Sequence, residues 1–307
     1  MRPTEPPGPL LERFRRGDRL ALSRLVSLVA RGEAIEAILE GVGPANSPAR
    51  VVSLTGAGGV GKSSLAGKLI EEIRERGQTV AVLACDPESP LTGGALLGDR
   101  FRMPARPDDD GVFIRSLAAA GGQGSLARHL GAIIRLVEAF GFGVVLLETV
   151  GAGQGDTAVH GLVDVLVLLL QPETGDDLQW EKAGLLEVAD VVVIHKADLP
   201  GAERVEAQVV AGLGLSHGPA PAVLRVSARS GAGVPELWEA IRSRPLRRGV
   251  RRDADELFRL LRERLAARFA ASRGEAEGLA ARWHSGAVST DEALAALAGM
   301  LVAERLR

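Results

Sequence analysis

The chain has 307 residues and a net charge of −2 at pH 7, a balance that argues against nucleic acid or an acidic membrane surface as a partner. Its hydrophobic fraction of 46% supports a substantial core, and its length fits one large α/β domain with helical additions or two modest domains. A single cysteine, Cys85, excludes an internal disulfide, and no apolar run approaches the roughly 20 residues of a membrane span, so we expect a cytoplasmic protein.

Residues 1–46 predict a helical N-terminal extension. Residues 3–9 are rich in proline, and we expect about the first nine residues to be disordered. Between residues 20 and 40, apolar side chains such as Leu22 and Val26 recur at helical spacing. The stretch GPANSPAR then predicts a linker.

Residues 47–245 predict an α/β domain in which short apolar runs alternate with helix-like stretches. The runs are VVSLT, TVAVLAC, VFIRS, FGVVLLE, VDVLVLLLQ, DVVVIHKAD and AVLRVSA. Runs this continuous are typical of strands that are covered on both faces. We therefore expect a mostly parallel sheet flanked by helices.

Residues 246–307 predict a helical C-terminal region. Ser289 or Thr290 suits the N-cap of the last helix. An apolar stripe at helical spacing has two interpretations, since it can fold back on its own domain or contact a second subunit. The stripe consists of Leu257, Leu260, Leu261, Leu265 and Phe269.

The segment GAGGVGKSS, which starts at Gly56, follows the first predicted strand and opens a helix. It fits the G-x-x-x-x-G-K-[ST] pattern of a phosphate-binding loop, whose backbone N–H groups face the phosphates of a nucleotide. Lys62 is expected to neutralise the β and γ phosphates, and the Ser63 hydroxyl to bind Mg²⁺. A glycine-rich turn without a ligand does not account for the whole motif. The predicted nucleotide contacts here are Gly58, Gly59, Val60, Gly61, Lys62, Ser63 and Ser64.

Acidic residues are expected beside the phosphates. Glu148 ends the apolar run FGVVLLE, where P-loop proteins hold or orient Mg²⁺. Just beyond it, the N–H of Gly151 can meet the γ-phosphate and Gln154 can help to position a water molecule. Asp86 follows the second apolar run, Asp99 lies further along the same segment, and either can bind Mg²⁺ through a water. Taken alone, each acid also fits a surface position or a helix cap.

The tetrapeptide HKAD, at residues 195–198, follows the apolar run VVVI and invites comparison with the Asn-Lys-x-Asp motif of GTP-binding proteins. In that motif the aspartate accepts hydrogen bonds from N1–H and the exocyclic amine of guanine, so Asp198 is expected to discriminate against ATP. Lys196 is expected to lay its aliphatic stem along the base. His195 stands where asparagine is expected, and it either supplies one of the missing hydrogen bonds or only packs at the end of the strand. Ser227 and Ala228, in SARSGAG, are expected to contact guanine through a backbone loop.

Five stretches together resemble the MeaB/MMAA/ArgK group of P-loop GTPases. They are GAGGVGKSSLAGKLI, DPESPLTGGALLGDRFRM, FIRSLAAAGGQG, ETVGAGQGD and GDDLQWEKAGLLEVADVVVIHKAD, and the likeness runs from about residue 10 to the tail. The resemblance implies a GTPase that acts as a chaperone of adenosylcobalamin-dependent acyl-CoA mutases, especially methylmalonyl-CoA mutase. Such a protein protects or reactivates the mutase and gates its cofactor loading. The resemblance also implies a homodimer formed through the C-terminal helices.

The resemblance also assigns residues by motif. With the reasoning above, it makes Lys62, Asp99, Glu148 and Gln154 the expected catalytic group, and it makes Ser63, Asp86, Asp99 and Glu148 the expected Mg²⁺ group. The stretch TGDDLQWEK resembles a third mobile loop that communicates with the mutase, with Asp177, Gln179, Trp180 and Lys182 as its partner-facing residues. This chain departs from the family at His195, and at Trp180 and Glu181, where the family usually has glycine and an aliphatic residue. The first departure bears on base affinity and the second on the identity of the partner mutase.

Other nucleotide-binding classes fit less well. Ala57 stands where ParA- and MinD-like ATPases carry a signature lysine. A P-loop ATPase or kinase, which the older ArgK label suggests, needs an acceptor site, and no distinct substrate domain separates the P-loop from HKAD. Nickel-insertion GTPases use cysteine and histidine in their nucleotide loops, whereas this chain has only Cys85 and five scattered histidines. A further alternative is a nucleotide-binding scaffold that has lost turnover, and the intact Lys62, Ser63, Asp86 and Glu148 argue against it.

Overall fold

The computed structural model describes residues 7–86, 109–119, 127, 129–149, 159–172, 183–214, 220–247, 261 and 273–302. The chain folds as two compact units, Met1–Arg248 and Gly249–Arg307, which are treated separately below. None of the helices in the described ranges is long and apolar enough to cross a membrane.

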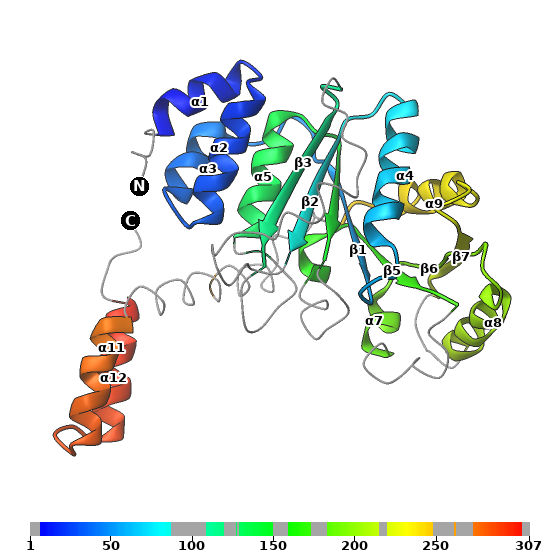
Figure 1. Cartoon of the computed structure of the whole chain (residues 1–307). Coiled ribbons are helices and arrows are strands. Elements are labelled where there is room, and N and C mark those ends of the chain that lie inside the picture. Colours follow the sequence, from blue (N-terminus) through cyan, green and yellow to red (C-terminus); the bar gives the residue numbers. More distant parts are fainter. Residues whose placement is uncertain are drawn as a thin grey trace. The chain divides into compact units, whose positions relative to one another are not determined.

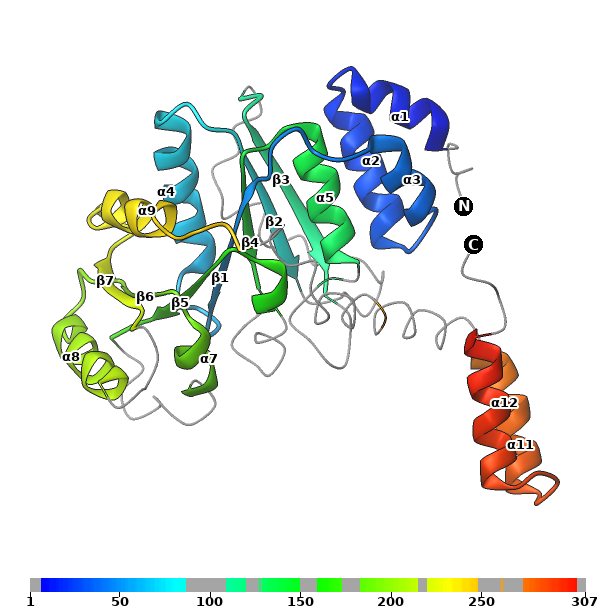
Figure 2. The same ribbon diagram turned by 180° about the vertical axis from the view of Figure 1, so that it is seen from behind.

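The first unit is built on a parallel sheet. In the described residues, seven strands pair in the order β3-β2-β4-β1-β5-β6-β7, and every neighbouring pair is parallel (Figures 1 and 2). The strands are β1 (Arg50–Gly56), β2 (Val80–Asp86), β3 (Val112–Ala118), β4 (Val144–Glu148), β5 (Val165–Leu170), β6 (Val191–His195) and β7 (Ala222–Val226). The inner strands β2, β4, β5 and β6 are buried along their whole length, as continuous apolar runs require. The predicted α/β fold is confirmed.

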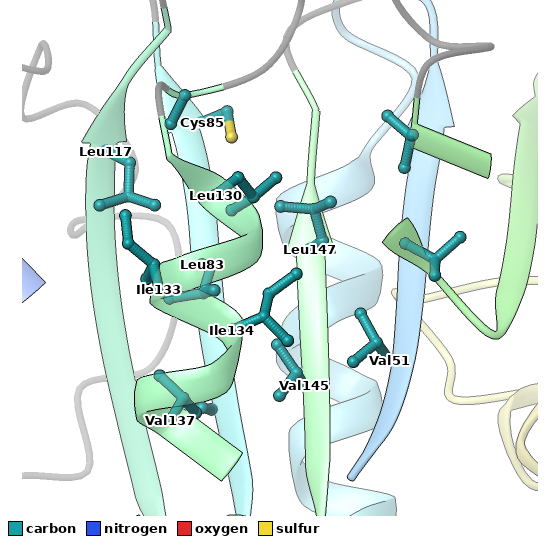
Figure 3. Close-up of a cluster of buried hydrophobic side chains, with 14 of the residues drawn as sticks. Val51, Leu83, Cys85, Leu117, Leu130, Ile133, Ile134, Val137, Val145 and Leu147 are labelled. Carbon is teal, nitrogen blue, oxygen red and sulfur yellow. The ribbon is translucent and has the colours of Figure 1, made fainter. Parts of the chain in front are cut away.

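Helices cover both faces of this sheet, and the sheet separates two hydrophobic cores. On one face, α4 (Lys62–Glu75) and α9 (Val234–Arg242) pack with residues such as Leu69 and Trp238. On the other face lie α5 (Leu130–Phe140), α7 (Ala183–Val188) and α8 (Ala202–Leu213). Figure 3 shows how α5 fills its face, because Leu130, Ile133, Ile134 and Val137 point at Leu83, Cys85, Leu117, Val145 and Leu147 from β2, β3 and β4. A short 3-10 helix, η2 (His160–Leu162), precedes β5.

Three N-terminal helices extend the second of these faces. They are α1 (Pro7–Arg15), α2 (Arg19–Ala30) and α3 (Ile35–Val42), and they pack on one another and on α5 (Figure 1). The expectation that about nine N-terminal residues are disordered was wrong for residues 7–9, because α1 already begins at Pro7, and proline is well tolerated in the first turn of a helix. The rings of Phe14 and Phe140 meet edge to face at 5.2 Å and join this helical group to the main core.

The second unit contains a helical hairpin of α11 (Arg273–His284) and α12 (Thr290–Val302). Ser289 caps α12, since its Oγ accepts from the Glu292 N–H at 3.2 Å while the Glu292 carboxylate accepts from the Ser289 N–H at 2.8 Å. This reciprocal pair confirms the predicted cap. Leu261 of the apolar stripe is 50% exposed, and the other four members of that stripe lie outside the described residues.

Candidate nucleotide-binding site

The P-loop connects β1 to α4, as the motif predicts. Its glycines have backbone conformations that other residues rarely adopt, with φ of 74° at Gly59 and 101° at Gly61. Gly56 is also sterically required, because a Cβ there would lie 2.5 Å from the carbonyl oxygen of Leu169. Lys62 is buried, and its Nζ donates to the carbonyl oxygens of Gly56 at 2.9 Å and Ala57 at 3.2 Å. The lysine ammonium therefore lies within the loop that is expected to hold the phosphates.

The remaining residues of the loop differ in their exposure. Gly58, Gly59 and Ser64 are exposed, whereas Val60 and Ser63 are buried. The exposed glycines leave their backbone N–H groups accessible to a phosphate, because no side chain covers them. Val60 packs into the hydrophobic core beneath α4 and anchors the loop.

Two buried carboxylates lie at the carboxyl ends of the neighbouring strands β4 and β2, and one hydroxyl contacts the carboxylate of β4. Glu148 ends β4, which pairs with β1 on one side and with β2 on the other, and Asp86 ends β2. The Ser63 hydroxyl donates to Oε1 of Glu148 at 2.6 Å, so the first turn of α4 and the end of β4 are in direct contact. Asp86 and Glu148 are each 5% exposed.

This donor set fits Mg²⁺. All three side chains offer oxygen, the ligand that Mg²⁺ prefers, and Mg²⁺ typically takes one or two carboxylates and completes its shell with water and substrate phosphates. The described part of the chain contains no group of three or more His, Cys, Asp or Glu residues that could hold a metal. Cys85 is an unsuitable metal ligand, because burial raises the pKa of its thiol to about 12.

The expected guanine-reading residues lie at the ends of β6 and β7. The Ser227 hydroxyl donates to Oδ1 of Asp198 at 2.6 Å, and this bond, more than any other interaction, lowers the pKa of the Asp198 carboxyl. The Ala197 N–H donates to the Val226 carbonyl at 3.2 Å and joins the two loops further. HKAD and SARSGAG therefore form one assembled surface that keeps Asp198 ionised as an acceptor.

Lys196 and Ala228 complete this surface. Lys196 is half-buried and has a left-handed backbone with φ of 56°, which is uncommon for a residue other than glycine. Such strained conformations cluster at functional sites, where the surrounding structure holds them. Ala228 is half-buried directly after Ser227, in the turn that brings the Ser227 N–H to the Ala232 carbonyl at 2.9 Å.

His195 does more than fill space at the end of β6. It is 3% exposed, and its Nδ1 lies 2.7 Å from the carbonyl oxygen of Val60 in the P-loop. The imidazole also packs against Gly61, where an added Cβ would lie 2.5 Å from Cε1 of the ring. Burial lowers the pKa of His195, so the ring is neutral at pH 7. A side chain of the HKAD tetrapeptide thus touches the P-loop directly.

Sequence reasoning missed one polar pair beside Glu148. The hydroxyls of Thr149 and Thr55 lie 3.2 Å apart, and the Thr149 N–H donates to the Leu54 carbonyl at 3.2 Å. Thr149 is 1% exposed. These bonds hold the end of β4 against the end of β1 and so orient Glu148 towards Ser63. The position of a hydroxyl residue directly after the acid was the available signal.

Several predicted site residues lie outside the described residues. These are Asp99, Gly151 and Gln154 of the catalytic and phosphate-binding groups, and Asp177, Gln179, Trp180 and Lys182 of the partner-facing loop.

Comparisons with known proteins identify the family of this chain. The family described as methylmalonyl Co-A mutase-associated GTPase MeaB matches residues 22–280. A protein of Pyrococcus horikoshii described as a GTPase is 41% identical over 245 residues, covering 78% of this chain and 77% of that protein. The mouse methylmalonic aciduria type A homolog, a mitochondrial protein of Mus musculus, is 41% identical over 198 residues, covering 62% of this chain and 48% of that protein.

Among solved structures, one described as a LAO/AO transport system kinase aligns with a TM-score of 0.65 and 24% identity, covering 96% of this chain and 97% of that one. This likeness bears on the fold alone. The family match spans most of the sequence, and its relatives are described as GTPases. The chain belongs to the MeaB family and is a GTPase.

Proposed function

We propose that this GTPase serves as a chaperone of an adenosylcobalamin-dependent acyl-CoA mutase. In this role it protects or reactivates the mutase and gates the loading of its cofactor, using the conversion of GTP to GDP and phosphate as its switch. The observation that supports this most is the match to the mutase-associated family over residues 22–280. The name of a mouse relative refers to methylmalonic aciduria, which supports methylmalonyl-CoA mutase as the kind of partner.

In the proposed mechanism, different residues bind the phosphates, the guanine base and Mg²⁺. Lys62 and the exposed backbone of the P-loop bind the phosphates, and Asp198 accepts the two guanine N–H groups that adenine lacks. When bound, Mg²⁺ supplies positive charge that neutralises the charge on the phosphates. Ser63, Glu148 and Asp86 would hold it, since they offer oxygen ligands at one end of the sheet. The proposed site also includes Asp99, Gly151 and Gln154, which we expect near the γ-phosphate.

We propose that the protein works as a cytoplasmic homodimer, with residues 1–46, 47–245 and 246–307 as an N-terminal helical extension, a GTPase domain and a dimerisation region. Support for self-association comes from the second unit itself. Its hairpin buries little of its own apolar surface, because Trp283 is 52% exposed and Leu294 is 59% exposed. Exposed large apolar side chains gathered on one element often mark a contact with another protein.

A turnover assay tests the chaperone role. GTP hydrolysis is measured for the purified protein alone and with each cobalamin-dependent acyl-CoA mutase from the same genome. One of these mutases should accelerate hydrolysis and form a complex whose stability depends on the nucleotide. The proposal fails if all of them leave hydrolysis, nucleotide affinity and complex formation unchanged.

A further inference from the structure

His195 replaces the expected asparagine, and the structure shows what it does with its hydrogen-bonding capacity. The carbonyl oxygen of Val60 can only accept, so the 2.7 Å contact requires a proton on Nδ1 of His195. The lowered pKa of this buried ring means that the neutral form carries that one proton and no other. Nε2 is then a bare acceptor, and it is buried without a hydrogen-bond partner among the described residues.

An asparagine side chain at this position would have a different capacity. Its amide nitrogen carries two N–H groups, whereas the neutral imidazole carries one. One N–H of the amide can bond the P-loop while the second donates to the base. Guanine offers an acceptor for such a donor at N7. A histidine whose single N–H already bonds Val60 has nothing left to donate.

The bond to Val60 has a clear mechanical role. Val60 is 1% exposed and packs into the core beneath α4, so its backbone is held on that side. On the other side, the His195 ring packs against Gly61, which directly precedes Lys62. Gly61 has a φ of 101°, a value that favours glycine. His195 thereby fixes the turn of the P-loop that leads into α4.

We propose that His195 is a positioning residue that clamps the P-loop through Val60 and leaves N7 of guanine without a hydrogen bond. Base selection then depends on Asp198 and its partner Ser227, which act on the other edge of the base. An asparagine at this position can bond both the P-loop and the base. In this chain His195 makes only the bond to the P-loop.

The analogue 7-deaza-GDP tests this directly, because it differs from GDP only in replacing N7 by C–H. We expect the wild-type protein to bind GDP and 7-deaza-GDP equally, within about twofold, in calorimetric titrations. His195→Asn should bind GDP up to about tenfold more tightly than wild type and should prefer it over 7-deaza-GDP by a similar factor, since one neutral hydrogen bond is worth about 0.5–1.5 kcal/mol. His195→Ala should weaken both ligands by the same factor, because it loosens the phosphate loop rather than a contact to the base. His284→Asn, at an exposed position in the second unit, is the matched control.

Two results would overturn the proposal. If the wild-type protein prefers GDP over 7-deaza-GDP by more than about fivefold and His195→Ala loses that preference, His195 donates to N7. If His195→Ala binds both ligands as tightly as wild type, there is no clamp. Nitrogen-15 NMR of the imidazole provides a test that depends on no variant's folding, because His195 should appear as the Nδ1–H tautomer, and an Nε2–H tautomer contradicts the bond to Val60. None of these measurements involves a mutase, so they stand apart from the chaperone proposal.

Discussion

The hydroxyl of Ser63 donates a 2.6 Å hydrogen bond to the buried carboxylate of Glu148, although the two residues are 85 positions apart in the sequence. A hydrogen bond from a hydroxyl to an ionised carboxylate is stronger than one between neutral groups. It brings the first turn of α4 to the end of β4, which is where P-loop proteins place a metal ion and the γ-phosphate.

This contact predicts a separation between binding and turnover. Glu148→Ala should lower GTP turnover by about 10–100-fold, the range seen when a group that orients a metal site is removed. GDP affinity should fall much less, because the proposed role of Glu148 lies with Mg²⁺ and the γ-phosphate. Phosphate release and GDP titration on the same preparation measure the two effects. Lys62→Ala is the contrasting variant, since it should lose turnover and much of the binding together; full turnover in Glu148→Ala would remove that residue from the site.

The Asp198–Ser227 pair predicts the base preference. GDP and GTP should bind well ahead of ADP and ATP, because Asp198 is held ionised as an acceptor for the guanine N–H groups. Asp198→Asn should relax or reverse this preference, since the amide N–H of asparagine can face the N–H donors of guanine, with which it cannot form a hydrogen bond. Ser227→Ala should weaken GDP by roughly 2- to 12-fold through the loss of one hydrogen bond of about 0.5–1.5 kcal/mol. Titration with all four nucleotides decides the matter, and ATP binding equal to GTP binding would refute the assignment of Asp198.

Burial of His195 predicts a dependence of stability on pH. Its pKa is lower in the folded protein than the usual 6.5, so the unfolded chain takes up its proton first as the pH falls. The neutral His195 therefore makes its full contribution to the free energy of unfolding at pH values above its pKa in the unfolded chain. This contribution is lost as the pH falls from there through the pKa of the folded protein. His195→Asn should flatten this part of the stability profile, measured by urea unfolding between pH 7.5 and 5. The exposed His284→Asn should leave the profile unchanged, and a parallel loss in all three proteins would exclude His195 as the cause.

Local patterns anticipated the elements of this fold better than the contacts between them. The continuous apolar runs placed the ends of each strand within three residues of their observed positions, because parallel strands buried on both faces are made mostly of apolar residues. The helical pattern of residues 20–40 hid a break between α2 and α3, where Gly32 and Ala34 take positive φ values. Motifs predicted which residue types form the candidate site. The bond from His195 to Val60 was not predicted, since it joins segments 135 residues apart and depends on how the sheet brings two loops together.

The second unit predicts a change in assembly on truncation. The full chain should be a dimer at micromolar concentration, and a chain ending at Pro245 should be a monomer that still binds GDP. The reason is that α11 and α12 expose large apolar side chains, whereas the predicted nucleotide-binding residues all precede residue 246. Light scattering measures the mass of both proteins. A monomeric full-length protein contradicts the proposed homodimer without touching the GTPase assignment.

The proposed partner loop makes the last prediction. Residues 174–182 lie between β5 and α7 in the sequence and outside the described residues. The carboxyl end of β5 pairs with the end of β1, directly before the P-loop. Loops at this end of the sheet can reorganise when a γ-phosphate arrives, and an aromatic such as Trp180 suits a contact with another protein. Trp180→Ala and Lys182→Ala should therefore blunt the acceleration of GTP hydrolysis by the mutase while leaving basal GDP affinity nearly unchanged.

Turnover assays with and without the mutase, run beside GDP titrations, measure both quantities for each variant. Arg282→Ala in the second unit serves as a control for the removal of a positive charge away from this loop. If Trp180→Ala and Lys182→Ala respond to the mutase as fully as wild type does, the partner contact lies elsewhere. If they lose GDP affinity in the same proportion as stimulation, the loop acts on the nucleotide and not on the mutase, because a partner contact alone leaves the basal affinity intact.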